Sequence, residues 1–169
     1  MRFFARKENT MAVSVPGLSS LGIRFGYGVE TTVGECPAAF TWLERCNNIA
    51  GIALSTETID ASALEDYVTR KVAGRQDAGD TWAVTFNYTE EVEQQLKDMI
   101  AAYNTGKPSG LRTWFEVWIP NSNEAFFVIA EPPQKLAMPE FGQNALLTIE
   151  VQFAIQEYHG TDVAIEPVG

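Results

Sequence analysis

Alternating apolar and polar residues recur along most of this chain, and this period of two constrains its fold more than any other feature. In the clearest run, over 81–88, Trp82, Val84, Phe86 and Tyr88 point one way and smaller or polar residues point the other. The same alternation predicts strands over 23–29 and 147–155, and shorter runs predict strands over 40–43 and 57–61. Strands of this kind bury one face, so the chain is predicted to be β-rich.

One segment, residues 89–104, has a helical period instead. Thr89 can cap the helix, and two glutamates follow it at the positive end of the helix dipole. The apolar residues form a single stripe, made of Val92, Leu96, Met99, Ile100 and Tyr103. The order of strands, one helix and strands predicts a mainly β fold, an antiparallel sandwich or barrel with this helix on its flank.

The strand predicted over 111–119 differs from the others because both of its faces are apolar. Trp114 and Trp118 share one face, and the opposite face is apolar as well. Both faces should therefore be covered, by the helix on one side and the core on the other, or by another subunit. Turn residues at 120–123 join this strand to an apolar run at 125–130, which predicts a hairpin.

Residues 62–80 carry charges of both signs and few apolar anchors, and they predict a long, charged, exposed loop. A loop of this length in a compact domain is usually functional or disordered. Its charges, together with the acidic residue just before it, are therefore candidates for a contact surface. These residues are Asp60, Glu65, Asp66, Arg70, Lys71, Arg75 and Asp77.

Proline, glycine and serine punctuate the chain near its ends. The predicted divisions are an N-terminal arm at 1–20, a single β-domain at 21–157 and a C-terminal tail at 158–169. In this N-terminal arm, Phe3 and Phe4 are candidates for docking on a neighbouring subunit. Met11 is also a plausible start, and the sequence leaves the choice between Met1 and Met11 open.

Composition argues against several classes of protein. The net charge of −10 argues against a nucleic-acid-binding surface, which needs clustered Lys and Arg. No apolar stretch approaches the roughly 20 residues of a membrane span, and the N-terminus becomes charged before a signal peptide could form. Cys36 and Cys46 are too few for a disulfide framework or a zinc site, so both are expected to be free thiols.

No constellation of residues in the sequence favours catalysis. His159 is the single histidine and has no cysteine or carboxylate cluster nearby, and Cys36 has no histidine to activate it. The carboxylate pairs at 65–66 and 90–91 fit solvated and helix-capping roles better than acid–base chemistry. The chain is therefore predicted not to be an enzyme, with no catalytic, cofactor-binding or metal site.

Several segments follow one another in an order that is typical of a known family. They are Gly26 to Thr32 in the first strand, Glu57 to Ala61 before the charged loop, Gly74 to Asp80, Val84 to Thr89 leading into the helix, and Phe115 to Pro120 in the hairpin. In these segments the chain resembles the tail tube (major tail) proteins of long-tailed bacteriophages. The resemblance covers roughly residues 21–157, and it rests on patterns without an invariant catalytic signature.

The resemblance implies a structural subunit that assembles into hexameric rings, whose sheets join into an inner barrel and which stack around a tape-measure protein. The channel of such a tube is typically negative, so that DNA passes through during ejection without being bound. Tail terminator and baseplate or tip proteins would be further partners, and a membrane would not. The protein would be made and assembled in the bacterial host cytoplasm and would end in the virion tail.

The same resemblance implies that the candidate residues form interfaces. The self-assembly interface would comprise the seven charged residues at 60–77 together with Phe3, Phe4, Trp114 and Trp118. Glu150 and Gln152, on the polar face of the last long strand, are candidates for lining the channel.

Two other readings remain open at the level of sequence. A related tube protein of a contractile tail or of a type VI secretion system would share these features, whether or not the tube is sheathed. A monomeric β-sandwich module that binds carbohydrate or peptide would instead use Trp114 and Trp118 as an exposed platform. The faces that line a channel, and the state of the free subunit, are open as well.

Overall fold

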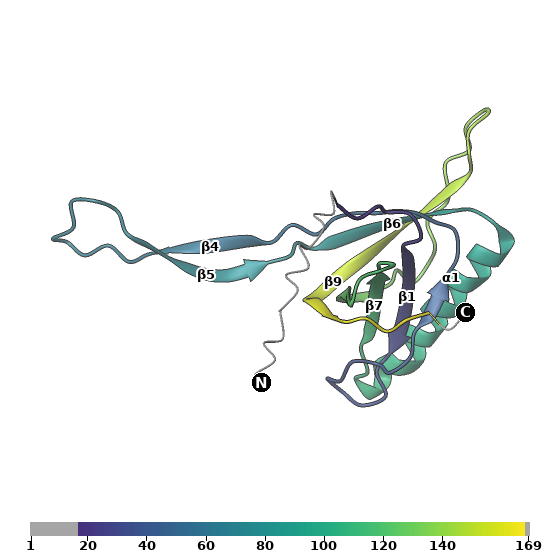
Figure 1. Ribbon diagram of the computed structural model, residues 1–169, viewed down its shortest axis with the longest axis horizontal. Helices are drawn as coiled ribbons and strands as arrows, with labels where there is room; N and C mark the ends of the chain where they lie inside the picture. Colours follow the sequence, from purple (N-terminus) through teal and green to yellow (C-terminus); the bar gives the residue numbers. More distant parts are fainter. Residues whose placement is uncertain (1–16, 168–169) are drawn as a thin grey trace, which may run out of the picture.

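The computed structural model of the protein describes residues 17–167 (Figure 1). Its strands are β1 (Arg24–Val29), β2 (Thr41–Leu43), β3 (Cys46–Ile49), β4 (Ser55–Asp60), β5 (Lys71–Asp77), β6 (Thr81–Asn87), β7 (Thr113–Trp118), β8 (Glu124–Glu131) and β9 (Thr148–Val163). The helix α1 (Glu90–Gly106) is followed by a short 3-10 turn, η1 (Lys107–Ser109). The predicted mainly β fold with one flanking helix is confirmed. Most of the predicted N-terminal arm, including Phe3 and Phe4, lies outside the described residues.

Seven strands form one antiparallel sheet in the order β2-β1-β7-β8-β9-β6-β3, and β4 and β5 pair separately. The larger sheet is strongly curled. Phe25 of β1 and Trp82 of β6 are separated by three intervening strands, yet their ring centroids are 5.5 Å apart. The sheet therefore folds over itself around the main core, as expected of a sandwich or barrel.

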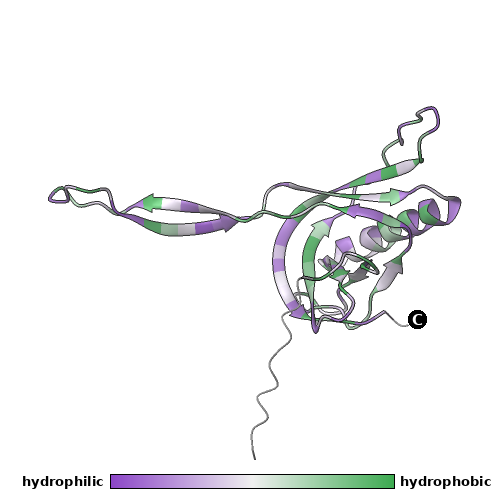
Figure 2. Ribbon diagram, turned by 45° about the horizontal axis from the view of Figure 1, so that its top comes forward, coloured by the Kyte–Doolittle hydropathy of each residue, from purple (hydrophilic) through white to green (hydrophobic). Residues whose placement is uncertain are grey.

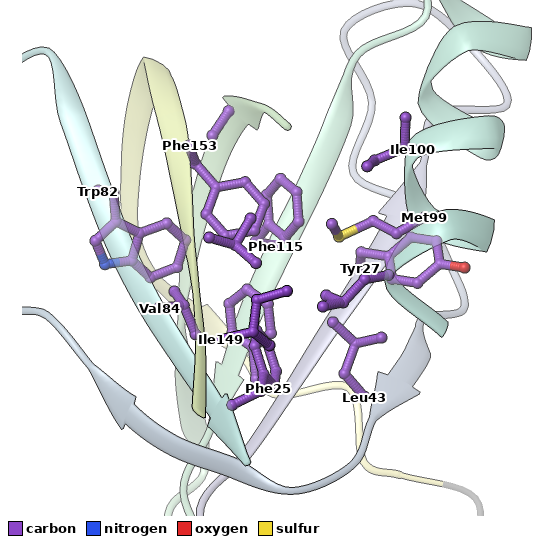
Figure 3. Packing of buried hydrophobic residues seen from close by; sticks show 14 of the residues in the cluster. Phe25, Tyr27, Leu43, Trp82, Val84, Met99, Ile100, Phe115, Ile149 and Phe153 are labelled. Atoms are coloured by element: carbon purple, nitrogen blue, oxygen red, sulfur yellow. The ribbon is translucent and has the colours of Figure 1, made fainter. Parts of the chain in front are cut away.

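Aromatic rings fill the inside of the curled sheet (Figure 3). Phe25, Phe115 and Phe153 are fully buried, and the centroids of Phe115 and Phe153 lie 4.6 Å apart. The alternation in β6 is realised as predicted, because Trp82, Val84 and Phe86 are buried whereas Ala83 and Thr85 between them are only partly buried. Tilted and edge-to-face ring pairs of this kind stabilise a core beyond the area that they bury.

The helix α1 occupies the predicted segment and is capped as predicted. The Thr89 hydroxyl accepts a hydrogen bond from the Val92 amide at 3.2 Å, and three glutamates lie in the first turn. Its apolar stripe is buried, all but Tyr103 of it in the main core, and the helix packs beside β1 and β2. Because β6 leads into α1 after only two residues, the helix covers the end of the sheet at which β6 finishes (Figure 1).

Two glycines of β1 are explained by close neighbours. A Cβ on Gly26 would lie 2.8 Å from the Trp42 ring, and a Cβ on Gly28 would lie 2.9 Å from the Ala39 carbonyl oxygen. Another part of the chain therefore approaches this face of β1 closely.

We expect Gly28→Ala to lower the free energy of unfolding by about 1–3 kcal/mol, because the new methyl group meets backbone that cannot rotate away. Urea denaturation followed by tryptophan fluorescence measures this loss. Gly51→Ala is the matched control, since a Cβ at Gly51 meets nothing within 4 Å, and it should change stability by no more than about 0.5 kcal/mol. Equal stabilities of the two variants would contradict the close approach at Gly28.

Two strands were not predicted from the sequence. The segment Cys46–Ile49 forms β3, which pairs with β6 through a register shift and has no alternating pattern. The expectation of an unstructured loop over 62–80 was wrong for Lys71–Asp77, which is β5 paired with β4. Both strands of this pair are exposed on both faces, so the pair has no buried face that could produce an alternating pattern.

The last strand extends into the segment that the sequence analysis assigned to a C-terminal tail. The strand β9 continues well past residue 155 and includes residues 158–163, which were assigned to a C-terminal tail. Register shifts between β8 and β9 let this long strand bend around the body. Beyond it, Ala164 and Ile165 pack on the outer face of β7 and β8. No helix within residues 17–167 is long and apolar enough to span a membrane.

Candidate assembly surfaces

The hairpin of β4 and β5 projects away from the body (Figures 1 and 2). We call this hairpin the arm; it is distinct from the N-terminal arm predicted at 1–20. Every residue of β4 is exposed, and in β5 only Gly74 is partly buried. Ile59 and Val72 are cross-strand partners, and each keeps about half of its surface exposed (55% and 51%). Since an isolated two-stranded hairpin is at best marginally stable in water, the arm is a candidate surface for contact with another molecule.

The residues that join the two strands of the arm, 61–70, form an ordered tip. The Asp66 carboxylate accepts a hydrogen bond from the Ala63 amide at 2.8 Å and pairs with the Arg70 guanidinium at 3.3 Å. The Arg70 amide donates to the Ser62 hydroxyl at 2.8 Å. Two of the charged residues predicted for the interface, Asp66 and Arg70, therefore stabilise the tip itself.

The other predicted charges also lie on the arm, and all of them are exposed. Asp60 accepts a hydrogen bond from the Ser62 amide at 2.9 Å, and hydrogen bonding from Ser62 lowers the pKa of the Asp60 carboxyl. Asp77 accepts from the Gly79 amide at 2.9 Å where the arm meets the body. The remaining three, Glu65, Lys71 and Arg75, are exposed along the tip and β5.

Three apolar side chains at the tip were missed as candidates because the charges of this segment dominated its interpretation. Leu64, Tyr67 and Val68 are exposed by 109%, 104% and 75% respectively. Their spacing within five residues of a charged segment is the signal that could have identified them. Apolar groups this exposed and this close together are typical of interaction surfaces.

Trp114 is not exposed in the structure, which removes the basis for a binding platform made of the two tryptophans. Only 3% of Trp114 is exposed, and it packs with Phe127 beneath Phe40, Ala164 and Ile165. The chain's own C-terminal segment thus covers the second apolar face of β7, where the sequence had suggested the helix or a partner. Trp118 is partly buried on the same face.

Two buried carboxylates on this side of the sheet were also missed. Both oxygens of Glu30 are used, because it accepts hydrogen bonds from the Gly34 and Arg112 amides at 3.1 Å and from the Trp114 indole at 2.7 Å. The Arg112 guanidinium adds an ion pair at 3.1 Å. Burial alone would raise the pKa of Glu30, but the hydrogen bonds from Trp114, Arg112 and Gly34 hold that pKa below its ordinary value.

Glu116 has the opposite environment. It is fully buried, and its Oε1 accepts a hydrogen bond from the Ile165 amide at 2.9 Å. Its Oε2 and the neighbouring Trp118 indole N–H have no hydrogen-bond partner within residues 17–167. Burial raises the pKa of Glu116 to about 7, which the single hydrogen bond from Ile165 only partly offsets. Below we call residues 164–165 the C-terminal clasp.

The outer face of β6 and β9 is polar and free of bulky apolar groups. Glu150 and Gln152 are exposed on β9, hydrogen-bond to each other, and stand opposite Thr85 and Ala83 of β6. Asn48 of β3 extends the same row beside Thr85. The predicted channel-lining residues therefore belong to a continuous polar face that spans three strands.

A second projection, the loop between β8 and β9, exposes further apolar groups. Met138, Phe141 and Leu146 are exposed by 84%, 71% and 68%. In the part of the chain that the structure describes, no three His, Cys, Asp or Glu side chains are grouped closely enough to hold a metal ion. The surfaces that stand out are thus the arm, the loop at 132–147 and the polar face.

The sequence matches no protein-family model and no curated protein. Solved structures do match the fold. One is a chain from the baseplate of the anti-feeding prophage (AFP), a 6-fold symmetrised structure, with a TM-score of 0.54 and 11% identity over 87% of this chain and 96% of that chain. Another is a chain from the tail of an empty GTA particle with C6 symmetry, with a TM-score of 0.53 and 10% identity over 88% of this chain and all of that chain. This chain therefore shares its fold with a chain from each of these two particles.

Proposed function

We propose that this protein is a structural subunit of a phage-type tail, and specifically that it forms the tail tube. In this proposal six copies form a ring, the rings stack, and the enclosed channel passes DNA during ejection. The tape-measure, terminator and baseplate or tip proteins would be its partners in the virion. The protein would act without catalysis or a cofactor.

The arm is the single observation that carries this proposal. Its paired strands alone span about 20 Å, as judged from the length of β4 at roughly 3.3 Å per residue, and the tip lies beyond them. None of its strand residues is buried by the chain itself. A pre-ordered exposed hairpin of this kind suits a subunit whose surface is completed by its neighbours.

The two structural neighbours support the symmetry of the proposed assembly. Both belong to particles with six-fold symmetry, and the likeness spans nearly the whole length of each. One comes from a tail and the other from a baseplate, so a tube-like ring subunit of a baseplate is the second candidate function. A subunit of the tube would polymerise without limit, whereas a baseplate subunit would stop at one ring.

The polar face of β3, β6 and β9 is the surface that we assign to the channel. It presents Glu150 with Gln152, Thr85 and Asn48, and it has no large apolar group that would need covering. A surface of this kind can remain wet and repel DNA phosphates, and the net charge of −10 on each subunit acts in the same sense.

Charge reversal on this face tests the assignment. We expect assembled Glu150→Lys/Gln152→Lys protein to retain short DNA that sediments with the polymer, and to release it as salt rises. The reason is that every ring would then place lysines around the channel. Gln94→Lys/Asp98→Lys changes the charge by the same amount on the exposed face of α1, and it is the matched control. Equal DNA retention by the two double variants would contradict the assignment.

A further inference from the structure

The curled sheet has an apolar cavity at the end away from α1. Its volume is about 210 Å3, and its walls include Ile52, Trp82, Val117, Phe126, Val128 and Tyr158. Trp82 lies near the start of β6, whereas α1 follows the end of that strand. Val117 pairs with Phe126, which is 39% exposed, at the corresponding end of β7 and β8. The core is therefore capped by a helix at one end and open at the other.

The arm tip is the complementary feature, because it offers apolar side chains that lack a receiving surface. A subunit cannot insert its own tip into its own cavity. The arm is about 20 Å long by its strand length, and only residues 78–80 separate β5 from β6. An apolar tip and an apolar cavity that cannot meet within one chain can both be buried when two copies meet.

We propose that the arm tip of one subunit docks in the open cavity of a second copy, with the Tyr67 ring inside and Leu64 and Val68 at the rim. This inference rests on the proposed function and names the contact that would link the subunits. The cavity equals about seven times the ~30 Å3 that one water occupies in the liquid, so it accommodates one large side chain.

The chemistry of the two surfaces fits this contact. Trp82, Phe126 and Tyr158 supply aromatic walls, and rings pair favourably with rings. A tyrosine can bury its ring while its hydroxyl stays at the wet rim. The hydrogen bonds of Asp66 and Ser62 hold the tip in one shape before contact, which reduces the entropy lost on binding.

Such a contact uses different patches on the two copies, so it is head-to-tail. Head-to-tail contacts close into rings or continue as helical assemblies, whereas a two-fold dimer uses the same patch twice. Each subunit would then carry one tip and one cavity, so mutations can disable either side of the contact separately.

The experiment uses the full chain and sedimentation of its polymers. Tyr67→Asp and Phe126→Asp should each raise the concentration needed for assembly by more than about ten-fold, because each places a charge in an apolar contact. An equimolar mixture of the two should form a one-to-one dimer and nothing larger, since only one intact tip and one intact cavity remain. Ile52→Asp is a second cavity variant, and circular dichroism shows which variants fold. Val33→Asp is the control and should assemble like the unmodified protein, because Val33 is exposed (62%) in the turn after β1 and belongs neither to the arm nor to the cavity.

Each other outcome overturns the inference. If the unmodified chain assembles but the mixture stays monomeric, then tip and cavity do not meet, although the proposed function stands. Assembly of Tyr67→Asp at the ordinary concentration would have the same meaning. If Phe126→Asp matters only while residues 1–16 are present, then that segment occupies the cavity. A chain that never assembles would overturn both the docking and the proposed function.

Discussion

Replacing Glu30 with glutamine should lower the free energy of unfolding by about 3 kcal/mol. This is the largest loss that we expect from replacing one residue by another of nearly the same shape. Glu30 is 2% exposed and accepts four hydrogen bonds through two oxygens. An amide has one acceptor oxygen, so at least two of the donors would face an NH2 group. One of the affected groups would be either the buried Trp114 indole or a backbone amide.

The matched control for this change is Glu157→Gln. Glu157 pairs with the same guanidinium, through Arg112 Nη1 at 2.9 Å, but its side chain is 56% exposed. An exposed ion pair of this kind contributes at most about 1 kcal/mol. Urea denaturation at pH 7 measures both variants, and a Glu30→Gln protein that is as stable as the Glu157→Gln protein would refute the role of the buried acceptor.

Replacing Glu116 with glutamine should instead raise the free energy of unfolding at neutral and alkaline pH. The pKa of Glu116 is about 7 in the folded protein and near 4.5 when the carboxyl is solvated, so its ionisation opposes folding. The penalty grows as the pH rises from about 4.5 to about 7 and is constant above that range. At about 1.4 kcal/mol per pKa unit, a difference of about 2.5 units amounts to about 3.5 kcal/mol at pH 8. Glu116→Gln should therefore be more stable by about that amount at pH 8 and similar to the original protein at pH 4.

Denaturation curves between pH 4 and pH 8 test this prediction. If the gain in stability were the same at every pH, it would come from packing and not from ionisation. Glu30 should contribute the opposite dependence of stability on pH. Its lowered pKa stabilises the folded state above the ordinary carboxyl range, and that contribution is lost as the pH falls through the folded-state pKa.

The two carboxylates also illustrate what a sequence can and cannot predict. Glu30 follows the alternating strand of residues 23–29, and Glu116 shares the face of β7 with two tryptophans, so neither differs by pattern from a solvated glutamate. Their burial depends on the C-terminal clasp and on the turn around Gly34, which approach from distant parts of the chain. Period and composition describe one segment at a time, and these contacts arise between segments.

The strands and the helix were predictable where one face of an element is buried. The segments of β6 and α1 were located almost to the residue because burial on one side produces a clear period. The strand β5 was missed for the same reason, because an arm that is exposed on both sides in the single subunit has no such period. Trp114 was assigned to an interface because the sequence could not show that Ile165 would cover it.

Electron microscopy of the purified full chain, over a range of concentrations, tests the tube assignment most directly. We expect rings of six subunits with a central channel, and at higher concentration stacked rings that form tubes of indefinite length. The mixed Tyr67→Asp and Phe126→Asp proteins, imaged alongside, should show neither. Particles of one subunit at every concentration up to precipitation, or closed assemblies without a channel, would show that this chain does not form a tail tube.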